Sequence, residues 1–330
     1  RGKIKLYSSI DERSAGFHGL GISAASGDMT VVITTSGTAV ANLLPSAVEA
    51  DRSNHPILFL TADRPLRLKD CGSNQTVNQE DFLESVCRLF INTNKKGLHQ
   101  MDNSAIISLI DSIKYKNSFS PGPIHLNIAF EKPLVISNAE KNQTLKLFDQ
   151  KYKNENISLR KYESLKKCNS YNSHTSIPID LTKPGIIIAG PYLGSIKDLK
   201  DFNDSLKTIQ FLSGWPIFAD PCSGVNSKLR GIIDNWELII SNKNISVSCE
   251  QLIRLGPMSS SKSLEEFLNN FKGTQILIKE NNSRRLDPLK KSFEYEFGLK
   301  QFENKLLEKN FNRSLQKKPL VELASKLINK

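Results

Sequence analysis

Three short polar clusters in the first part of the sequence carry the side chains best suited to chemistry. They are Asp11-Glu12-Arg13, Thr35-Ser36-Gly37-Thr38 and Thr61-Ala62-Asp63-Arg64-Pro65. Each follows an apolar run typical of a strand (residues 4–7, 31–34 and 57–60), and helix-compatible segments lie between them at 14–26 and 39–50. Because the loops after parallel strands meet at one edge of a sheet, this alternation predicts a ligand site there. The alternative is that Asp11, Ser36 and Thr38 only cap helices.

Glu12 and Arg64 are the strongest candidates within these clusters. A carboxyl group beside a glycine-rich helix can lie in a desolvated pocket, where its affinity for a proton rises. Glu12 would then act as a general acid or share a proton with an aminopyrimidine-type cofactor; the alternative is a salt bridge with Arg13. Arg64 lies on a stiff turn before Pro65, which suits bidentate capture of a carboxylate. Its alternative is pairing with Asp63.

Two further candidates lie outside the clusters. Gln75 is part of a long polar loop, residues 66–78, where its amide can bind a carboxylate or a hydroxyl group; the alternative is a solvated loop residue. Lys262 stands near the head of a predicted helix over residues 260–271, a place favourable to anions, with plain solvent exposure as its alternative. His125 alternates with apolar neighbours, and we expect it to be structural.

The composition is that of a globular protein with room for two domains. The chain has 330 residues and a formal net charge of +11. Its basic residues are scattered and no basic helix is interleaved with aromatic residues, so we expect no nucleic-acid partner; an anionic substrate or a solvated surface accounts for the charge. The five cysteines show no C-x-x-C spacing, which argues against disulfides and a zinc site and indicates a reducing cytoplasm. No apolar run approaches ~18 residues, so no membrane partner is expected.

Changes in sequence texture divide the chain into four segments. Alternating strands and helices predict a parallel-sheet domain over residues 1–137, with helices at 79–90 and 104–115 and a strand at 124–128. A Lys/Asn/Ser-rich linker follows at 138–180. We expect a second, Rossmann-like parallel-sheet domain over 181–292 and a charged linker over 293–330. The turn from Gly190 to Gly194 lacks the G-x-G-x-x-G spacing of dinucleotide sites, so a structural role is expected for the second domain.

Several of these motifs resemble those of one enzyme family. The stretches are Ile10 to Ser14, Thr35 to Asn42, Leu60 to Pro65, Asp70 to Gln75, Leu255 to Lys262 and Arg285 to Pro288. They resemble the thiamine-diphosphate-dependent 2-succinyl-5-enolpyruvyl-6-hydroxy-3-cyclohexene-1-carboxylate synthases of menaquinone and phylloquinone biosynthesis. The loop of residues 61–75 distinguishes this family from its acetolactate-synthase-like relatives. The resemblance implies an α/β protein in which a thiamine-diphosphate-fold pyrimidine domain precedes a Rossmann-like middle domain.

The same resemblance implies a reaction and the residues that carry it. The family consists of transferases (carboligases) that decarboxylate 2-oxoglutarate and add the succinyl group to isochorismate, with thiamine diphosphate and Mg²⁺ or Mn²⁺ as cofactors. Glu12 matches the catalytic glutamate that bonds the pyrimidine ring and drives its imino tautomer, and Thr38 and Asn42 match the lining of the pyrimidine pocket. Three residues match binders of substrate carboxylates and hydroxyls: Arg64, Gln75 and Lys262. Ser263 stands where the family commonly has a second basic residue, so one anion contact is not matched.

Compared with this family, the sequence matches only part of an active site. The family's opening element, with a Gly-Ser-Arg-Ser loop for substrate, is expected before Arg1, and the domain that anchors diphosphate and metal is expected after the chain; Gly27-Asp28-Met29 lies in the wrong place to supply that anchor. The family's site forms between subunits, which implies a homodimer or homotetramer and a chain that is inactive alone. The alternatives are another thiamine-diphosphate-dependent 2-oxo acid decarboxylase or carboligase, and a nucleotide-binding module on the second domain.

Overall fold

The chain forms two compact units, Arg1–Tyr171 and Asn172–Lys330, and each is described by itself. The computed structural model describes residues 4–93, 102–131, 135, 137–143, 145–146, 177–242, 249–280, 282 and 284–310. Most of the expected linker over 138–180 lies outside these residues. None of the helices within them is long and apolar enough to cross a membrane.

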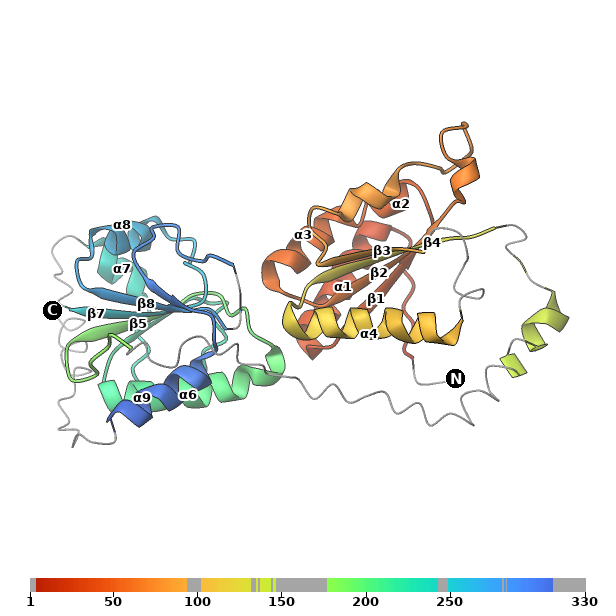
Figure 1. The fold of residues 1–330 in the computed structure, drawn as a ribbon. Coiled ribbons are helices and arrows are strands. Elements are labelled where there is room, and N and C mark those ends of the chain that lie inside the picture. Colours follow the sequence, from red (N-terminus) through yellow and green to blue (C-terminus); the bar gives the residue numbers. More distant parts are fainter. Residues whose placement is uncertain are drawn as a thin grey trace. The chain divides into compact units, whose positions relative to one another are not determined.

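The first unit is built on a four-stranded parallel sheet in the order β1-β2-β4-β3 (Figure 1). The strands are β1 (Thr30–Thr34), β2 (Ile57–Asp63), β3 (Leu89–Asn92) and β4 (Pro123–Ala129). Helices α1 (Glu12–Ser26), α2 (Thr38–Ala41) and α3 (Leu44–Ser53) cover one face of the sheet, and α4 (Asn103–Phe119) covers the other. The core on the first face contains Phe59 of β2, and the core on the other face contains Leu126 of β4. These residues belong to neighbouring strands, and their side chains point to opposite faces of the sheet.

Two stretches of this unit differ from the predictions. Residues 4–7 form no strand, and the side chains of Ile4 and Leu6 are 87% and 81% exposed. No described strand pairs with them, so their apolar pattern has no sheet to join. Residues 79–90, expected as a helix, hold the 3-10 helix η2 (Gln79–Leu83) and then enter strand β3. Pairing of β3 with Ile124–Asn127 of β4 overrides the local helical pattern.

The helix predicted over residues 39–50 is divided between α2 and α3. Pro45 lies in the first turn of α3, where the missing backbone N–H removes no helical hydrogen bond. Asn42 caps the end of α2, and its backbone N–H bonds back to Thr38. Asn42 therefore lies at the junction between α2 and α3, where its side chain meets Glu12.

Glycines in α1 allow this helix to approach its neighbours closely. A Cβ atom at Gly16 would clash with the Ser46 hydroxyl of α3, and one at Gly19 would lie 2.7 Å from a methyl group of Val32 in β1. No atom of the part of the chain that the structure describes lies within 4 Å of a Cβ atom at Gly21. The helix is thus packed tightly against the sheet along one side only.

Gly19→Ala is expected to destabilise the first unit relative to Gly21→Ala by about 2 kcal/mol. Both substitutions gain the same helix propensity, roughly 1 kcal/mol, but only the first forces Val32, a β-branched side chain with a stiff χ1 angle, to move. Urea unfolding followed by far-UV circular dichroism measures the difference. Both tryptophans, Trp215 and Trp236, lie in the second unit, so their fluorescence transition is an internal control that should not shift. Equal stabilities of the two variants would contradict the packing argument.

The second unit has a five-stranded sheet in the order β6-β5-β7-β8-β9, and all its pairs are parallel. The strands are β5 (Gly185–Ala189), β6 (Ile217–Ala219), β7 (Gln251–Leu255), β8 (Thr274–Ile278) and β9 (Phe293–Tyr295). Helices α6 (Leu199–Ser213) and α9 (Leu299–Asn310) pack on one face, and α7 (Trp236–Ser241) and α8 (Lys262–Asn270) on the other. Two parallel-sheet units with helices on both faces confirm the predicted α/β class.

The second unit continues past residue 292, into the segment expected as a linker. Strand β9 pairs with β8, and Phe302 and Leu306 of α9 are buried in the core. The many charged residues of this segment led to the linker prediction, although the apolar residues of α9 lie on one face of the helix. Residues 311–330 of the same segment lie outside the described residues.

Asp287, from the motif Arg285 to Pro288, holds the chain that leads into β9. It is fully buried and bonds the Arg254 guanidinium of β7 at 2.9 Å. It also accepts the backbone N–H groups of Lys291 and Ser292 at 2.7 and 2.8 Å. Although burial acts to raise the pKa of Asp287, these bonds and the Arg254 charge lower it to about 2, so the carboxylate stays ionised.

Candidate active site

Glu12 and Asn42 meet at the edge of the first sheet. Glu12 is the first residue of α1 and is half-buried, and its Oε2 atom accepts a hydrogen bond from Asn42 Nδ2 at 3.2 Å. Its other oxygen, Oε1, has no protein partner within the described residues. The alternative salt bridge between Glu12 and Arg13 is not formed. A carboxylate oriented by a neutral amide, with one oxygen left to accept, can hold a ring nitrogen of a ligand.

The capping alternative is correct for one of three residues. Asp11 is the N-cap of α1, where its side chain accepts from the Ser14 backbone N–H at 2.8 Å. Ser36 does not cap: its buried hydroxyl donates to the backbone carbonyl of Gln75 at 3.0 Å. Helix α2 begins at Thr38, which is exposed, and its N-cap is Gly37, without a side-chain bond. The cluster that follows β1 is therefore fastened to the long loop instead of closing a helix end.

Arg64 does not pair with Asp63 through its side chain, contrary to the alternative. The buried Asp63 carboxylate accepts from the Arg64 backbone N–H and from Asn127 Nδ2, both at 2.7 Å, and lies 3.0 Å from Lys69 Nζ. Lys69 also pairs with Glu80. Burial alone would lower the pKa of Lys69, but its bonds to Glu80 and Asp63 outweigh this and raise it. Asp63 is thus fully engaged, and the side chain of Arg64, a half-buried residue, has no bond within the described residues.

The other two predicted binders lie in different units. Gln75 is exposed, its backbone is left-handed with φ 55°, and its carbonyl is held by Ser36. A Cβ atom at Gly37 would lie 3.6 Å from Gln75 Cα, so the loop and the turn after β1 are in contact. Lys262 is the exposed first residue of α8 in the second unit, preceded by its N-cap Ser261. The structure thus places Gln75 against the turn before Thr38. Lys262 is described only relative to the other residues of the second unit.

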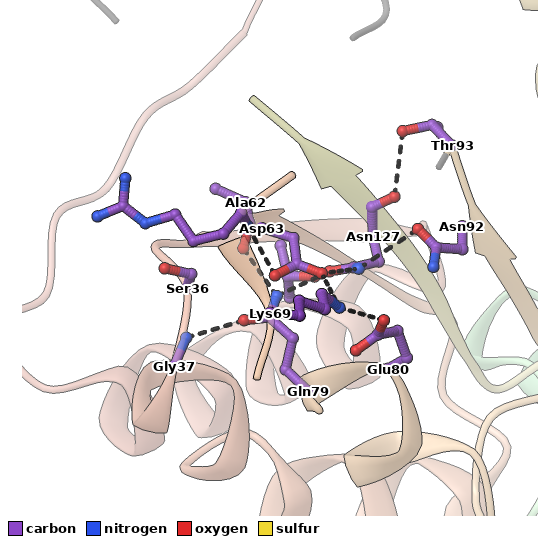
Figure 2. Close-up of polar contacts among 12 residues, drawn as sticks. Ser36, Gly37, Ala62, Asp63, Lys69, Gln79, Glu80, Asn92, Thr93 and Asn127 are labelled. Atoms are coloured by element: carbon purple, nitrogen blue, oxygen red, sulfur yellow. Dashed lines mark hydrogen bonds and ion pairs between the residues drawn. The ribbon is translucent and has the colours of Figure 1, made fainter. Parts of the chain in front are cut away.

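A buried polar network below this edge is the part of the site that the sequence did not predict (Figure 2). Gln79 is fully buried, and its Oε1 atom accepts from the Gly37 backbone N–H at 2.8 Å. Its Nε2 atom donates to the Ala62 carbonyl and to Asn127 Oδ1, both at 2.8 Å. Asn127 in turn donates a hydrogen bond from Nδ2 to the Asp63 carboxylate. The network therefore joins the ends of β2 and β4 to the turn after β1.

His125 extends this network into the core as a neutral ring. The Thr61 hydroxyl, which has one proton, donates to Asn127 Oδ1 at 2.8 Å, so it must accept from His125 Nε2 at 2.8 Å. The other ring nitrogen, Nδ1, is buried and has no hydrogen-bond partner among the residues that the structure describes. Burial lowers the pKa of His125 to about 4, which the Glu80 carboxylate opposes only in part.

This lowered pKa predicts that the first unit loses stability in mild acid. The unfolded chain takes up a proton on His125 near pH 6.5 and the folded chain only near 4, so stability falls as the pH falls through this window. Between pH about 7.5 and about 5 we expect a loss of about 2 kcal/mol that His125→Gln abolishes. Urea unfolding of both proteins by circular dichroism measures it. Parallel pH profiles for wild type and variant would contradict the assignment.

The residues present fit one part of thiamine diphosphate. The Glu12 carboxylate, whose Oε1 atom has no partner among the described residues and whose Oε2 atom is bonded by Asn42, suits the pyrimidine ring. No group of three or more His, Cys, Asp or Glu that could hold a metal ion occurs among the described residues. The fit therefore concerns the pyrimidine ring and not the diphosphate or its metal.

The glycine turn of the second sheet is filled by backbone. A Cβ atom at Gly190 would overlap the carbonyl of Pro257, and one at Gly256 would meet the carbonyl of Pro191. These two turns, after β5 and β7, pack on each other where a dinucleotide site would present free backbone to a phosphate.

The sequence of this chain is similar to those of known thiamine-dependent enzymes. Residues 1–89 match the family described as thiamine pyrophosphate enzyme, N-terminal TPP binding domain. A 2-succinyl-5-enolpyruvyl-6-hydroxy-3-cyclohexene-1-carboxylate synthase of Prochlorococcus marinus strain MIT 9515 is 56% identical over 99% of this chain and 55% of its own length. The protein of the same name from strain NATL1A is 46% identical over 93% of this chain and 51% of its own length. The chain thus spans about half the length of these relatives.

The resemblance inferred from the motifs is therefore confirmed: the first 89 residues match the N-terminal domain of thiamine pyrophosphate enzymes, and nearly the whole chain is similar to synthases of that kind.

Proposed function

We propose that the complete protein catalyses the thiamine-diphosphate-dependent decarboxylation of 2-oxoglutarate and the addition of the succinyl group to isochorismate, in menaquinone or phylloquinone biosynthesis. The observation that carries this proposal is the Glu12 carboxylate at the sheet edge, bonded by Asn42 and open at Oε1. The relatives named as 2-succinyl-5-enolpyruvyl-6-hydroxy-3-cyclohexene-1-carboxylate synthases support the choice of substrates. The enzyme is a transferase of the carboligase type.

Glu12 and Asn42 would act on the pyrimidine ring. When bound, thiamine diphosphate supplies the electron sink for decarboxylation. Glu12 would bond a pyrimidine ring nitrogen and share a proton with it, and Asn42, which bonds the Glu12 carboxylate, would keep it turned toward that nitrogen. Thr38, four residues before Asn42 and joined to it by a backbone bond, lines the same pocket. The side chains at this edge would therefore take part in proton transfer and would not act as nucleophiles.

Arg64, Gln75 and Lys262 would bind the carboxylates and hydroxyls of the two substrates. Arg64 is suited to this because its side chain has no bond within the described residues, while the carboxylate of the neighbouring residue, Asp63, is occupied. A planar guanidinium binds a carboxylate through two parallel hydrogen bonds. Gln75 is exposed on a loop that Ser36 fixes. The formal charge of +11 suits anionic substrates as well.

The remaining parts of the site are proposed for the complete protein. We propose that Mg²⁺, or Mn²⁺, and the diphosphate are bound outside the residues described, and that the working enzyme is a cytoplasmic homodimer or homotetramer. The relatives, about twice as long as this chain, leave room for such a part. Lys262, which lies in the second unit, is proposed as a substrate binder as well.

A product assay tests the function. The complete protein with thiamine diphosphate and Mg²⁺ is mixed with 2-oxoglutarate and isochorismate, and the adduct is identified by mass spectrometry. We expect the succinyl adduct, no adduct when pyruvate replaces 2-oxoglutarate, and no product without cofactor. An adduct from pyruvate alone would instead indicate another thiamine-diphosphate-dependent carboligase.

A further inference from the structure

Gln79 occupies a central place in the first unit that the proposed reaction does not use directly. Its side chain is fully buried and makes three hydrogen bonds of 2.8 Å, to Gly37, Ala62 and Asn127. The first lies on the turn after β1, the second on β2 and the third on β4. Figure 2 shows Gln79 between the Gly37 turn and Asn127. One amide thus ties three separate segments together at the sheet edge.

The Gly37 turn depends on this bond for its position. Gly37 has φ 84° and ψ −137°, a conformation that side-chain-bearing residues avoid, and no side chain caps helix α2 behind it. Its N–H group points instead to Gln79 Oε1. Among the described residues, the only other side-chain hydrogen bond of this turn runs from the Ser36 hydroxyl to the carbonyl of Gln75. The four residues that follow Gly37 form α2, which ends at Asn42, the partner of Glu12.

We propose that Gln79 is a positioning residue for cofactor binding, which acts by holding the Gly37 turn and, through α2, the Asn42 amide that orients Glu12. Oε1 fixes the turn, and Nε2 fixes Gln79 itself against β2 and β4. This inference rests on the proposed function. It assigns Gln79 no contact with cofactor or substrate.

Two substitutions separate positioning from simple structural support. Gln79→Glu keeps an acceptor oxygen for the Gly37 N–H but sets a second oxygen against the Ala62 carbonyl and Asn127 Oδ1, with Asp63 and Glu80 nearby. Gln79→Met has similar length but no acceptor and no charge. A buried unpaired charge costs more stability than a missing hydrogen bond. Stability should therefore fall most in Gln79→Glu, whereas the hold on the turn should fail only in Gln79→Met.

The experiment measures the dissociation constant of thiamine diphosphate with Mg²⁺ for the complete protein, at a temperature below every melting midpoint. We expect about tenfold weaker binding for Gln79→Met and near wild-type binding for Gln79→Glu, although Gln79→Glu has the lower Tm. The matched control is Gln275→Met, which removes a buried glutamine of the second unit bonded to the Leu268 carbonyl at 3.3 Å. Its cofactor affinity should not change.

The outcomes are distinguishable. Wild-type affinity in Gln79→Met, or affinities that simply follow the melting temperatures, would overturn the positioning role. If Gln79→Glu does not fold, the comparison of Gln79→Met with Gln275→Met decides, because equal affinities in these two overturn the role and weaker binding in the first supports it. A wild-type protein that binds no thiamine diphosphate refutes the proposed function itself, and with it this inference.

Discussion

Glu12→Gln in the complete protein is expected to lower turnover by roughly 1,000-fold or more. The amide keeps the shape of the side chain and an oxygen that can accept from Asn42, but it cannot exchange a proton with the pyrimidine ring. Because the loss concerns proton transfer, kcat should fall while the affinity for thiamine diphosphate changes by less than about tenfold. Steady-state assay of the succinyl adduct and a separate cofactor titration measure the two effects.

Glu49→Gln is the matched control for this variant. Glu49 is an exposed glutamate of α3 in the same unit, and the loss of its charge should leave turnover unchanged. Near-normal turnover in Glu12→Gln would remove Glu12 from the reaction and leave only its contact with Asn42. A parallel loss of folding, seen in the circular dichroism transition, would mean that the variant reports stability and not chemistry.

The parts of the site predicted from the sequence are those that a local pattern carries. The apolar run of residues 57–60 followed by Asp63 and Arg64 indicated the end of a strand, and β2 ends at Asp63. Asp11 was a candidate helix cap and is the N-cap of α1, and Pro45 lies in the first turn of α3. Strand ends, caps and proline breaks depend on a few neighbouring residues, so they can be read before the fold is known.

The polar network could not be predicted because its members are far apart along the chain. Gln79 bonds a residue 42 positions away, and Asn127 bonds one 64 positions away. These contacts follow from the pairing of β2 with β4, in which Thr61 lies opposite Asn127, and no local pattern specifies that register. A helix was predicted over residues 79–90, and nothing in that prediction indicated that Gln79 is buried in the core.

Arg64→Gln is expected to reduce kcat/KM for 2-oxoglutarate by about 100-fold, mostly through a higher KM. The guanidinium has no bond within the described residues, so its removal breaks no internal contact and should leave the stability of the first unit unchanged. Arg64→Lys keeps the charge but loses the planar pair of donors, and we expect an intermediate loss of about tenfold. Steady-state kinetics at saturating isochorismate measure both variants.

Arg67 provides the control that separates a bound carboxylate from general positive charge. It lies three residues from Arg64 and has an exposed guanidinium, which pairs with Glu131 at 2.6 Å. Arg67→Gln removes the same charge from the same loop, yet it should leave kcat/KM within about twofold, because an exposed, screened pair contributes little. If Arg67→Gln and Arg64→Gln lower kcat/KM for 2-oxoglutarate equally, long-range attraction explains the effect and Arg64 has no direct contact with the substrate. A loss confined to Arg64, graded from Lys to Gln, is what two parallel hydrogen bonds to a carboxylate require.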